Sequence, residues 1–192
     1  MRVKIILRAV ITICAMFLFI AAGPSANAQE IYTRTVIGVG GTLGGVSRSF
    51  TLRIDSYTSN AEASRALAVL AEGGQDRLLR ELEGKRLGNF SLGGRLGRDI
   101  NFVNETRAAD GRRRITILFA RWMNLYELRY GTRSQDYPFS YLEMFIDGNG
   151  KGEGTFIPAA KIYFDKKNGN QLDVENFGIY PARLTGVRLH KS

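Results

Sequence analysis

The sequence predicts a mainly β protein of the β-rich α+β class, in which an antiparallel meander of about eight or nine strands forms a barrel or a sandwich. Three observations predict this fold. Beyond residue 30 most apolar residues alternate with polar ones, which is typical of strands with one buried face. Short turn sequences separate these runs. Residues 59–84 follow the helical period instead, and they predict an inserted pair of short helices.

The first predicted hairpin joins residues 31–39 to residues 49–55. Its second strand alternates cleanly, with an inward-facing set of Phe50, Leu52 and Ile54. The glycine-rich link over residues 40–45 has the spacing of neither a dinucleotide-binding loop nor a Walker loop, so it is interpreted as a turn. We therefore expect no nucleotide cofactor.

The predicted helical pair begins at a capping box. Ser59 is placed to accept a hydrogen bond from the amide of Glu62, whose carboxylate can reach back to the amide of Ser59. Gly73 and Gly74 are expected to end the first helix, because glycine adopts the left-handed conformation at low cost. The second helix is predicted over residues 76–83, and the pair should cover one face of the sheet or the mouth of a barrel.

Strand patterns return after the helices and continue to the end of the chain. Ile100 and Phe102 are predicted to share one face of a strand, and Asp110-Gly111 is a strong hairpin turn. Residues 121–137 fit a helical turn and an irregular strand equally well. The other predicted strands cover residues 87–92, 114–120, 171–177 and 183–190.

Residues 137–165 predict one long hairpin. Its first arm is apolar on both faces, which is typical of a strand that lies centrally in a sheet. Trimming Phe156 to Ala in this hairpin should cost about 3–5 kcal/mol if its face is core. If the turn pairs even-numbered residues with even-numbered ones, one core face gathers Leu142, Met144, Ile146, Phe156, Ala160, Ile162 and Phe164, whereas an odd register would mix the two faces.

The other face of this hairpin is too polar for plain core and too aromatic for plain surface. Glu143 lies between two aromatic residues on it, and carboxylates in such surroundings are often catalytic acids. The alternative interpretation is an ion pair with Arg129, Arg133 or Lys161 on a neighbouring strand. The predicted ligand-binding residues on this face are Tyr141, Glu143, Phe145, Lys161 and Tyr163.

Residues 1–28 have the composition of a cleaved secretory signal peptide. Cations flank a short apolar run, and an Ala-x-Ala site ends at Ala28. The run is shorter than the roughly 20 residues that span a bilayer, which favours cleavage over an uncleaved anchor. We expect an exported protein, periplasmic or secreted, in which residues 29–192 form a single β-rich domain without a transmembrane segment.

The scarcity of cysteine and histidine excludes several chemistries. Cys14 is the only cysteine and lies in the predicted signal peptide, so the mature chain forms no disulfides. His190 is the only histidine, so zinc sites of the Cys and His type cannot form. Residues 147–152 resemble a calcium loop, but Lys151 and Pro158 occupy ligand positions, which favours a hairpin turn. We assign no catalytic residue, no metal and no cofactor.

The chain is basic, with 27 Lys and Arg against 18 Asp and Glu and a formal net charge of +9. The excess lies in the middle third, where arginines are interleaved with aromatic residues, a combination that suits polyanions. A solubilising surface is the alternative interpretation. The predicted anion-binding residues are Arg112, Arg113, Arg114, Arg121, Arg129 and Arg133.

Three functional hypotheses follow, in order of preference. The first is a non-enzymatic binding protein that holds a small or acidic ligand against the second face of the central hairpin. The second is a module that binds polyanions or the cell envelope through the region from Arg112 to Arg133. The third is a hydrolase centred on Glu143, which needs a second carboxylate within roughly 5–10 Å.

Overall fold

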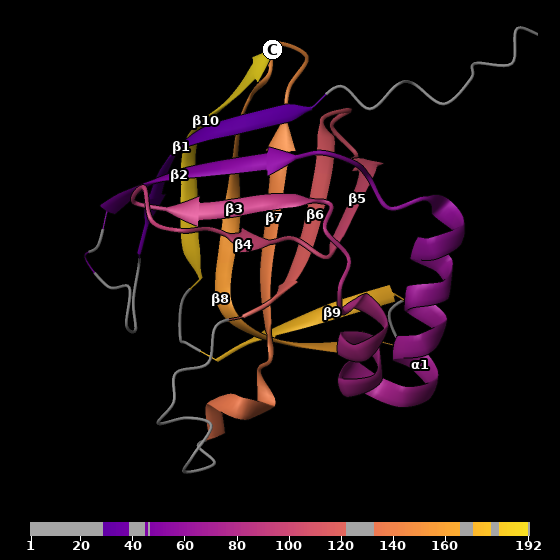
Figure 1. Ribbon diagram of the computed structural model, residues 1–192. Helices are drawn as coiled ribbons and strands as arrows, with labels where there is room; N and C mark the ends of the chain where they lie inside the picture. The colour runs from indigo at the N-terminus through magenta and orange to yellow at the C-terminus, as the bar shows by residue number, and fades with distance from the viewer. Residues whose placement is uncertain are drawn as a thin grey trace, which may run out of the picture.

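The computed structural model describes residues 29–38, 45, 47–121, 133–165, 171–177 and 181–191. The predicted signal peptide and residues 122–132 lie outside this part. Within it, ten strands form one antiparallel sheet accompanied by one α-helical element and a short 3-10 helix, η2 (Arg133–Asp136) (Figure 1). In chain order the elements are β1 (Glu30–Ile37), β2 (Ser47–Ile54), α1 (Asn60–Leu82), β3 (Gly88–Leu92), β4 (Arg98–Asp99), β5 (Phe102–Arg107), β6 (Arg113–Ala120), β7 (Phe139–Ile146), β8 (Lys151–Asp165), β9 (Gln171–Asn176) and β10 (Ala182–Lys191).

The sheet folds over on itself into two layers. Its strand order is β4-β3-β2-β1-β10-β8-β7-β6-β5, and β9 pairs with β8. In Figure 1, β1 to β4 cross in front of β6, β7 and β8 at a steep angle. The arrangement is sandwich-like and does not close into a barrel, so the sandwich is the predicted alternative that is observed. Consecutive strands pair within β1–β4 and within β5–β8, as expected for a meander, while β10 inserts between β1 and β8.

The larger hydrophobic core fills the space between the two layers. Phe90 lies at its centre, with its ring centroid 5.1 Å from that of Phe156, 5.7 Å from Phe119 and 6.0 Å from Phe50. Leu142 lies directly opposite Phe156 in the pairing of β7 with β8, which confirms the even register at this point. The central hairpin therefore holds the middle of the fold, as predicted.

Strand β8 changes faces part-way along its length. The register of β7 and β8 shifts so that Phe139 lies opposite Ala160, whereas Tyr141 lies opposite Ile157. Pro158 lies at this irregularity, and proline has no N–H to donate to a neighbouring strand. The expectation of one continuous core face is therefore wrong beyond this point. Leu142 and Phe156 belong to the core between the layers, while a second core takes Ala160, Ile162 and Phe164.

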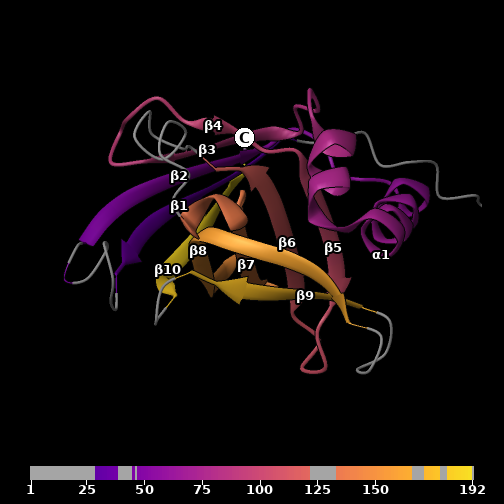
Figure 2. The same ribbon diagram turned by 90° about the horizontal axis from the view of Figure 1, so that it is seen from below.

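Helix α1 covers the outer face of the sheet, the face that points away from the core between the layers. It forms the second core against this face. Its leucines Leu70, Leu78 and Leu82 are buried together with outward-facing residues of β5, β6 and β7. Seen from below in Figure 2, α1 lies beside β5 and β6. This position confirms that the helical pair covers one sheet face.

The two arms of α1 follow from local sequence signals. Both hydrogen bonds of the capping box are present: the Glu62 amide donates to Ser59 Oγ at 3.3 Å, and the Ser59 amide donates to Glu62 Oε2 at 3.0 Å. Gly74 has non-helical backbone angles, φ 69° and ψ −172°, and breaks the helix as the glycine pair predicts. Arg65 in the first arm lies 2.8 Å from Glu81 in the second.

Ile100 and Phe102 do not share a face, which corrects the prediction. The Leu87 amide donates to the carbonyl of Ile100, and the Ile100 amide donates to the carbonyl of Gly88. These bonds hold Ile100 in the first core just before β5 begins, where Val103 joins it. Phe102 points instead to the second core.

No helix in the described part of the chain is long and apolar enough to cross a membrane.

Candidate ligand-binding groove

A groove of about 340 Å³ lies between α1 and the outer face of β5, β6 and β7. Its lining divides into two regions of different polarity. The apolar region lies under the helix and consists of Ala63, Ala66, Leu67, Leu70, Leu78, Phe102, Leu118 and Leu172. The polar region consists of Ser64, Asn104, Thr106, Arg114, Thr116 and Tyr141.

Strand alternation produces this division. In β6, Ile115 and Ile117 face the core between the layers, so the residues between them face outward. Pairing with β5 then sets Leu118 opposite Phe102, Thr116 opposite Asn104 and Arg114 opposite Thr106. Polarity therefore rises step by step from the helix-covered end of the strands to the open end.

Arg114 is held at the polar end of the groove. Its Nε donates to Glu143 Oε1 at 2.6 Å, and the Tyr141 hydroxyl lies 3.1 Å from the same oxygen. Burial and the neighbouring charge of Glu143 raise the pKa of Tyr141, so its hydroxyl stays protonated and donates this bond. The Glu143 side chain is 18% exposed and that of Arg114 is 47% exposed, so the arginine is the member of the pair that meets solvent.

The structure brings together three of the five residues predicted to bind a ligand. Tyr141, Glu143 and Phe145 share the outer face of β7, and the Arg112 guanidinium lies 5.2 Å from the ring centroid of Phe145. Lys161 and Tyr163 lie beyond the irregularity of β8, in the half of that strand that pairs with β9. Tyr163 there donates a hydrogen bond to Asp173. The register shift near Pro158 explains this separation.

The arginines predicted to bind anions do not gather on one surface. Arg112 pairs with Asp110 and Glu153, and Arg114 pairs with Glu143. Arg113, between them, points to the opposite face of β6 because successive residues of a strand alternate. Arg121 donates through Nε to the carbonyl of Tyr137. Two predicted residues are left, Arg129, which lies outside the described residues, and Arg133, whose backbone alone is described, in a short 3-10 helix.

Arg113 is the centre of a half-buried polar network at one end of the sandwich. Its Nη2 lies 3.0 Å from Glu30 Oε1 and 2.7 Å from Glu105 Oε2. The hydroxyls of Tyr32 and Tyr57 donate to Glu30, and burial followed by these hydrogen bonds raises the pKa of both tyrosines. The network joins β1, β5 and β6. Sequence reasoning missed it, because Glu30 and Arg113 are 83 positions apart in the chain.

The described residues show no group of three or more His, Cys, Asp or Glu side chains arranged to hold a metal ion. In the turn of the central hairpin, the acidic residue Asp147 stabilises the turn. Asp147 Oδ1 accepts hydrogen bonds from the amides of Asn149 and Lys151, at 2.8 and 2.9 Å, which makes it an ordinary turn-stabilising side chain.

Comparison with known proteins adds no functional assignment: no protein-family model, no curated protein and no solved structure matches this chain.

Proposed function

We propose that this protein binds a small amphipathic anion, of the medium-chain carboxylate type, in the groove between α1 and β5–β7. The observation that carries the proposal is the division of the groove into an apolar end under the helix and a polar end at Arg114. A ligand with an apolar body and one anionic group has the same division. The volume of about 340 Å³ lies within the range of roughly 300–1,000 Å³ typical of small-molecule sites.

The fixed orientation of Arg114 supports this proposal. A guanidinium has five N–H hydrogens in a planar fork, and the one on Nε is directed at Glu143. The plane of the fork is thereby set before a ligand arrives, so that less side-chain freedom is lost on binding. Thr116 and Asn104, which line the groove beside Arg114, supply further polar groups.

The hydrolase alternative receives less support from the geometry. It needs a carboxylic acid that exchanges a proton with a substrate, together with a second carboxylate. Glu143 accepts instead from Arg114 and Tyr141, as in a structural ion pair. Among the described residues its ionic partner is Arg114 on the adjacent strand and not Lys161, while Arg129 and the side chain of Arg133 lie outside the described part of the chain.

We also propose that the chain is exported after cleavage before Gln29. Besides the sequence pattern, the start of β1 at Glu30 supports this site, because the first strand of the fold begins directly after it. Mass spectrometry of the protein recovered outside the producing cells' cytoplasm tests this proposal. A mature chain that retains residues 1–28 would contradict it.

Isothermal titration calorimetry with decanoate and decanol tests the binding proposal. We expect the wild-type protein to bind decanoate, and Arg114→Gln to weaken that binding roughly tenfold or more, as for loss of a hydrogen bond between charged groups. Decanol should bind weakly and equally to both proteins. Ala63→Phe, which places a ring in the apolar end, should abolish binding of both ligands.

Arg53→Gln is the matched control, because Arg53 lies on the outer face of β2, remote from the groove, and its substitution removes the same charge. It should bind decanoate as the wild type does. Absence of decanoate binding, or equal binding by wild type and Arg114→Gln, would overturn the proposal.

A further inference from the structure

A second surface, independent of the groove, lies on the outer face of β2, β1 and β10. Register places its residues in rows across the three strands. One row is Ser49, Thr35 and Thr185, and the next is Thr51, Thr33 and Arg188. We call the five hydroxyl groups of these rows the hydroxyl grid. A bulge between Thr33 and Thr35 widens the spacing of the rows on β10, and Thr33 Oγ1 lies 2.6 Å from His190 Nε2.

Cations without carboxylate partners lie along one side of this grid. Arg183 and Arg188 are exposed on β10, and no carboxylate among the described residues lies within ion-pair distance of either. Lys151 of β8 lies directly opposite Arg188. Like charges at directly opposed positions repel each other, and a bound anion would offset that repulsion.

The acidic residues nearest this face are already neutralised. Asp55 lies 3.1 Å from Arg53 at the far edge of the grid. On the other side, Glu153 pairs with Arg112, and Asp147 accepts from backbone amides of its own turn. The face therefore has an excess of positive charge on its β10 side and hydroxyl groups over its middle.

We propose that this face binds an acidic polysaccharide. Arg183, Arg188 and Lys151 contact its acidic groups, and the hydroxyl grid contacts its hydroxyl groups. Charge complementarity selects an anionic partner. The hydroxyl grid favours a carbohydrate over a lipid surface, because a membrane-binding face presents many apolar residues for insertion and Ile37, which is 41% exposed opposite Arg183, is the one large exposed apolar side chain on this face among the described residues. The surface differs from the one predicted from sequence: Arg112 and Arg113 pair with carboxylates on opposite faces of β6, and Arg114 lines the groove.

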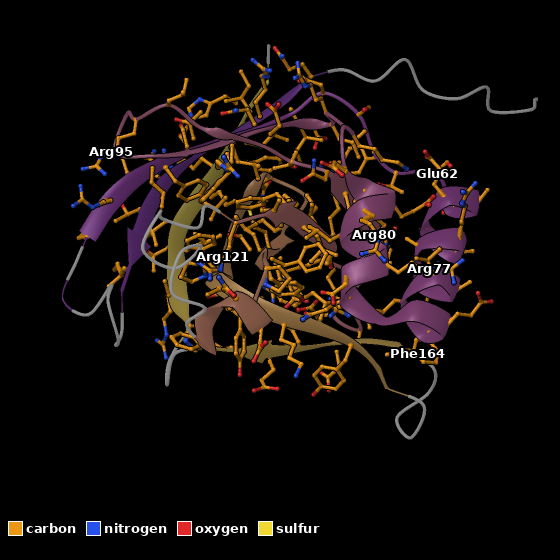
Figure 3. All side chains as sticks on the ribbon, turned by 60° about the horizontal axis from the view of Figure 1, so that its bottom comes forward. Glu62, Arg77, Arg80, Arg95, Arg121 and Phe164 are labelled. Carbon is orange, nitrogen blue, oxygen red and sulfur yellow. The ribbon has the colours of Figure 1, made fainter. Side chains whose placement is uncertain are left out.

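Two polymers and one vesicle preparation test this proposal: heparin, polygalacturonate and phosphatidylglycerol vesicles, all at 150 mM NaCl, on the order of physiological ionic strength. We expect retention on both polymers and none on the vesicles. Arg183→Gln/Arg188→Gln should weaken polymer binding roughly tenfold, since each exposed ionic contact contributes a few-fold. The control Arg65→Gln/Arg77→Gln removes the same charge from α1, where Figure 3 labels Arg77 and where both side chains are exposed, and it should bind as the wild type does.

A second variant tests the hydroxyl grid separately. Thr35→Val/Thr185→Val removes two facing hydroxyl groups while keeping side-chain shape and strand preference. It should weaken polygalacturonate binding several-fold with no change in the charge of the protein. Equal losses in the two arginine double variants, unchanged binding by the threonine variant, or stronger binding to vesicles than to polymers would each overturn the proposal. Decanoate binding should be unaffected throughout, because the groove lies over β5 and β6, and strands β8 and β7 separate β6 from β10.

Discussion

Arg114 Nε lies 2.6 Å from Glu143 Oε1, although the two residues are not opposite each other in the sheet. Thr116 lies opposite Glu143, and Phe145 lies opposite Arg114. The ion pair is therefore diagonal, which long side chains can span. Because Arg114 lines the groove and Glu143 does not, the carboxylate offsets the arginine charge from outside the binding surface.

This geometry predicts that substituting Arg114 weakens decanoate binding, whereas substituting Glu143 strengthens it. Glu143→Gln keeps an oxygen acceptor for Arg114 but removes the opposing charge, so decanoate should bind about fivefold more tightly, as the loss of one modest ionic interaction allows. Titration calorimetry measures the change, with Glu81→Gln in α1 as the control. Weaker binding by Glu143→Gln would mean that Arg114 does not hold the anion.

Arg113 should contribute more to the free energy of unfolding than Arg112, the residue next to it, because Arg113 is the centre of the half-buried polar network. Arg113→Met leaves Glu30 and Glu105 half-buried without their cation and should lower the free energy of unfolding by about 3 kcal/mol. Arg112→Met, on the exposed face, should change it little. Urea denaturation compares the two variants. Similar midpoints for both would contradict a structural role for the network.

The kink of α1 depends on the backbone of Gly74 alone. Its φ of 69° and ψ of −172° belong to a region that only glycine adopts readily, while a Cβ there would meet no atom within 4 Å. Gly74→Ala should therefore cost about 1–3 kcal/mol through backbone strain and not through a clash. Gly148→Ala, which is equally open but has no positive φ, should be nearly neutral in the same thermal unfolding experiment.

Phe156→Ala tests the shared centre of the two layers. The side chain is 4% exposed and touches Phe90, so its removal should cost about 3–5 kcal/mol in urea denaturation. Leu96, which is 96% exposed, provides the control, and Leu96→Ala should be neutral. A comparable loss in both variants would show that Phe156 is not core.

Local signals predicted the parts of this fold that local chemistry determines. The capping box at Ser59 and the helix break at Gly74 follow from spacing and conformation. The sequence left the register of the central hairpin open, and the structure shows the even pairing of Leu142 with Phe156. The sequence shows a proline, Pro158, within a predicted strand. It does not show which face of the sheet the residues after Pro158 occupy, because that depends on how β8 pairs with β7.

The candidate groove was only partly predictable. Tyr141 was named because it is an aromatic residue beside a carboxylate, and the structure does place it at the groove. Thr116, Asn104 and the helix residues were missed, because only the tertiary docking of α1 on β5 and β6 makes them neighbours. The triplet at residues 112–114 appeared to be one basic cluster, yet strand alternation and distant carboxylates divide it.

The capping carboxylate gives the fold an acid-sensitive element. Hydrogen bonds from the Ser59 amide and hydroxyl, followed by Lys85, lower the pKa of Glu62 from 4.5 to about 2. Lys85 Nζ lies 3.1 Å from Glu62 Oε1. This ion pair links the start of the first arm of α1 to Lys85, which follows the end of the second arm. Figure 3 shows Glu62 at that end of the helix.

Because the folded pKa lies below the unfolded one, ionised Glu62 stabilises the protein above about pH 4.5, and this contribution is lost as pH falls towards 2. Glu62→Gln should therefore be less stable than the wild type by about 1 kcal/mol at pH 7, the usual size for an exposed cap. The difference should shrink as the pH is lowered through this window. Urea denaturation of both proteins at a series of pH values measures it, with Glu72→Gln in the same helix as the control. A difference that stays constant from pH 7 to pH 2 would show that the charge of Glu62 does not stabilise the cap.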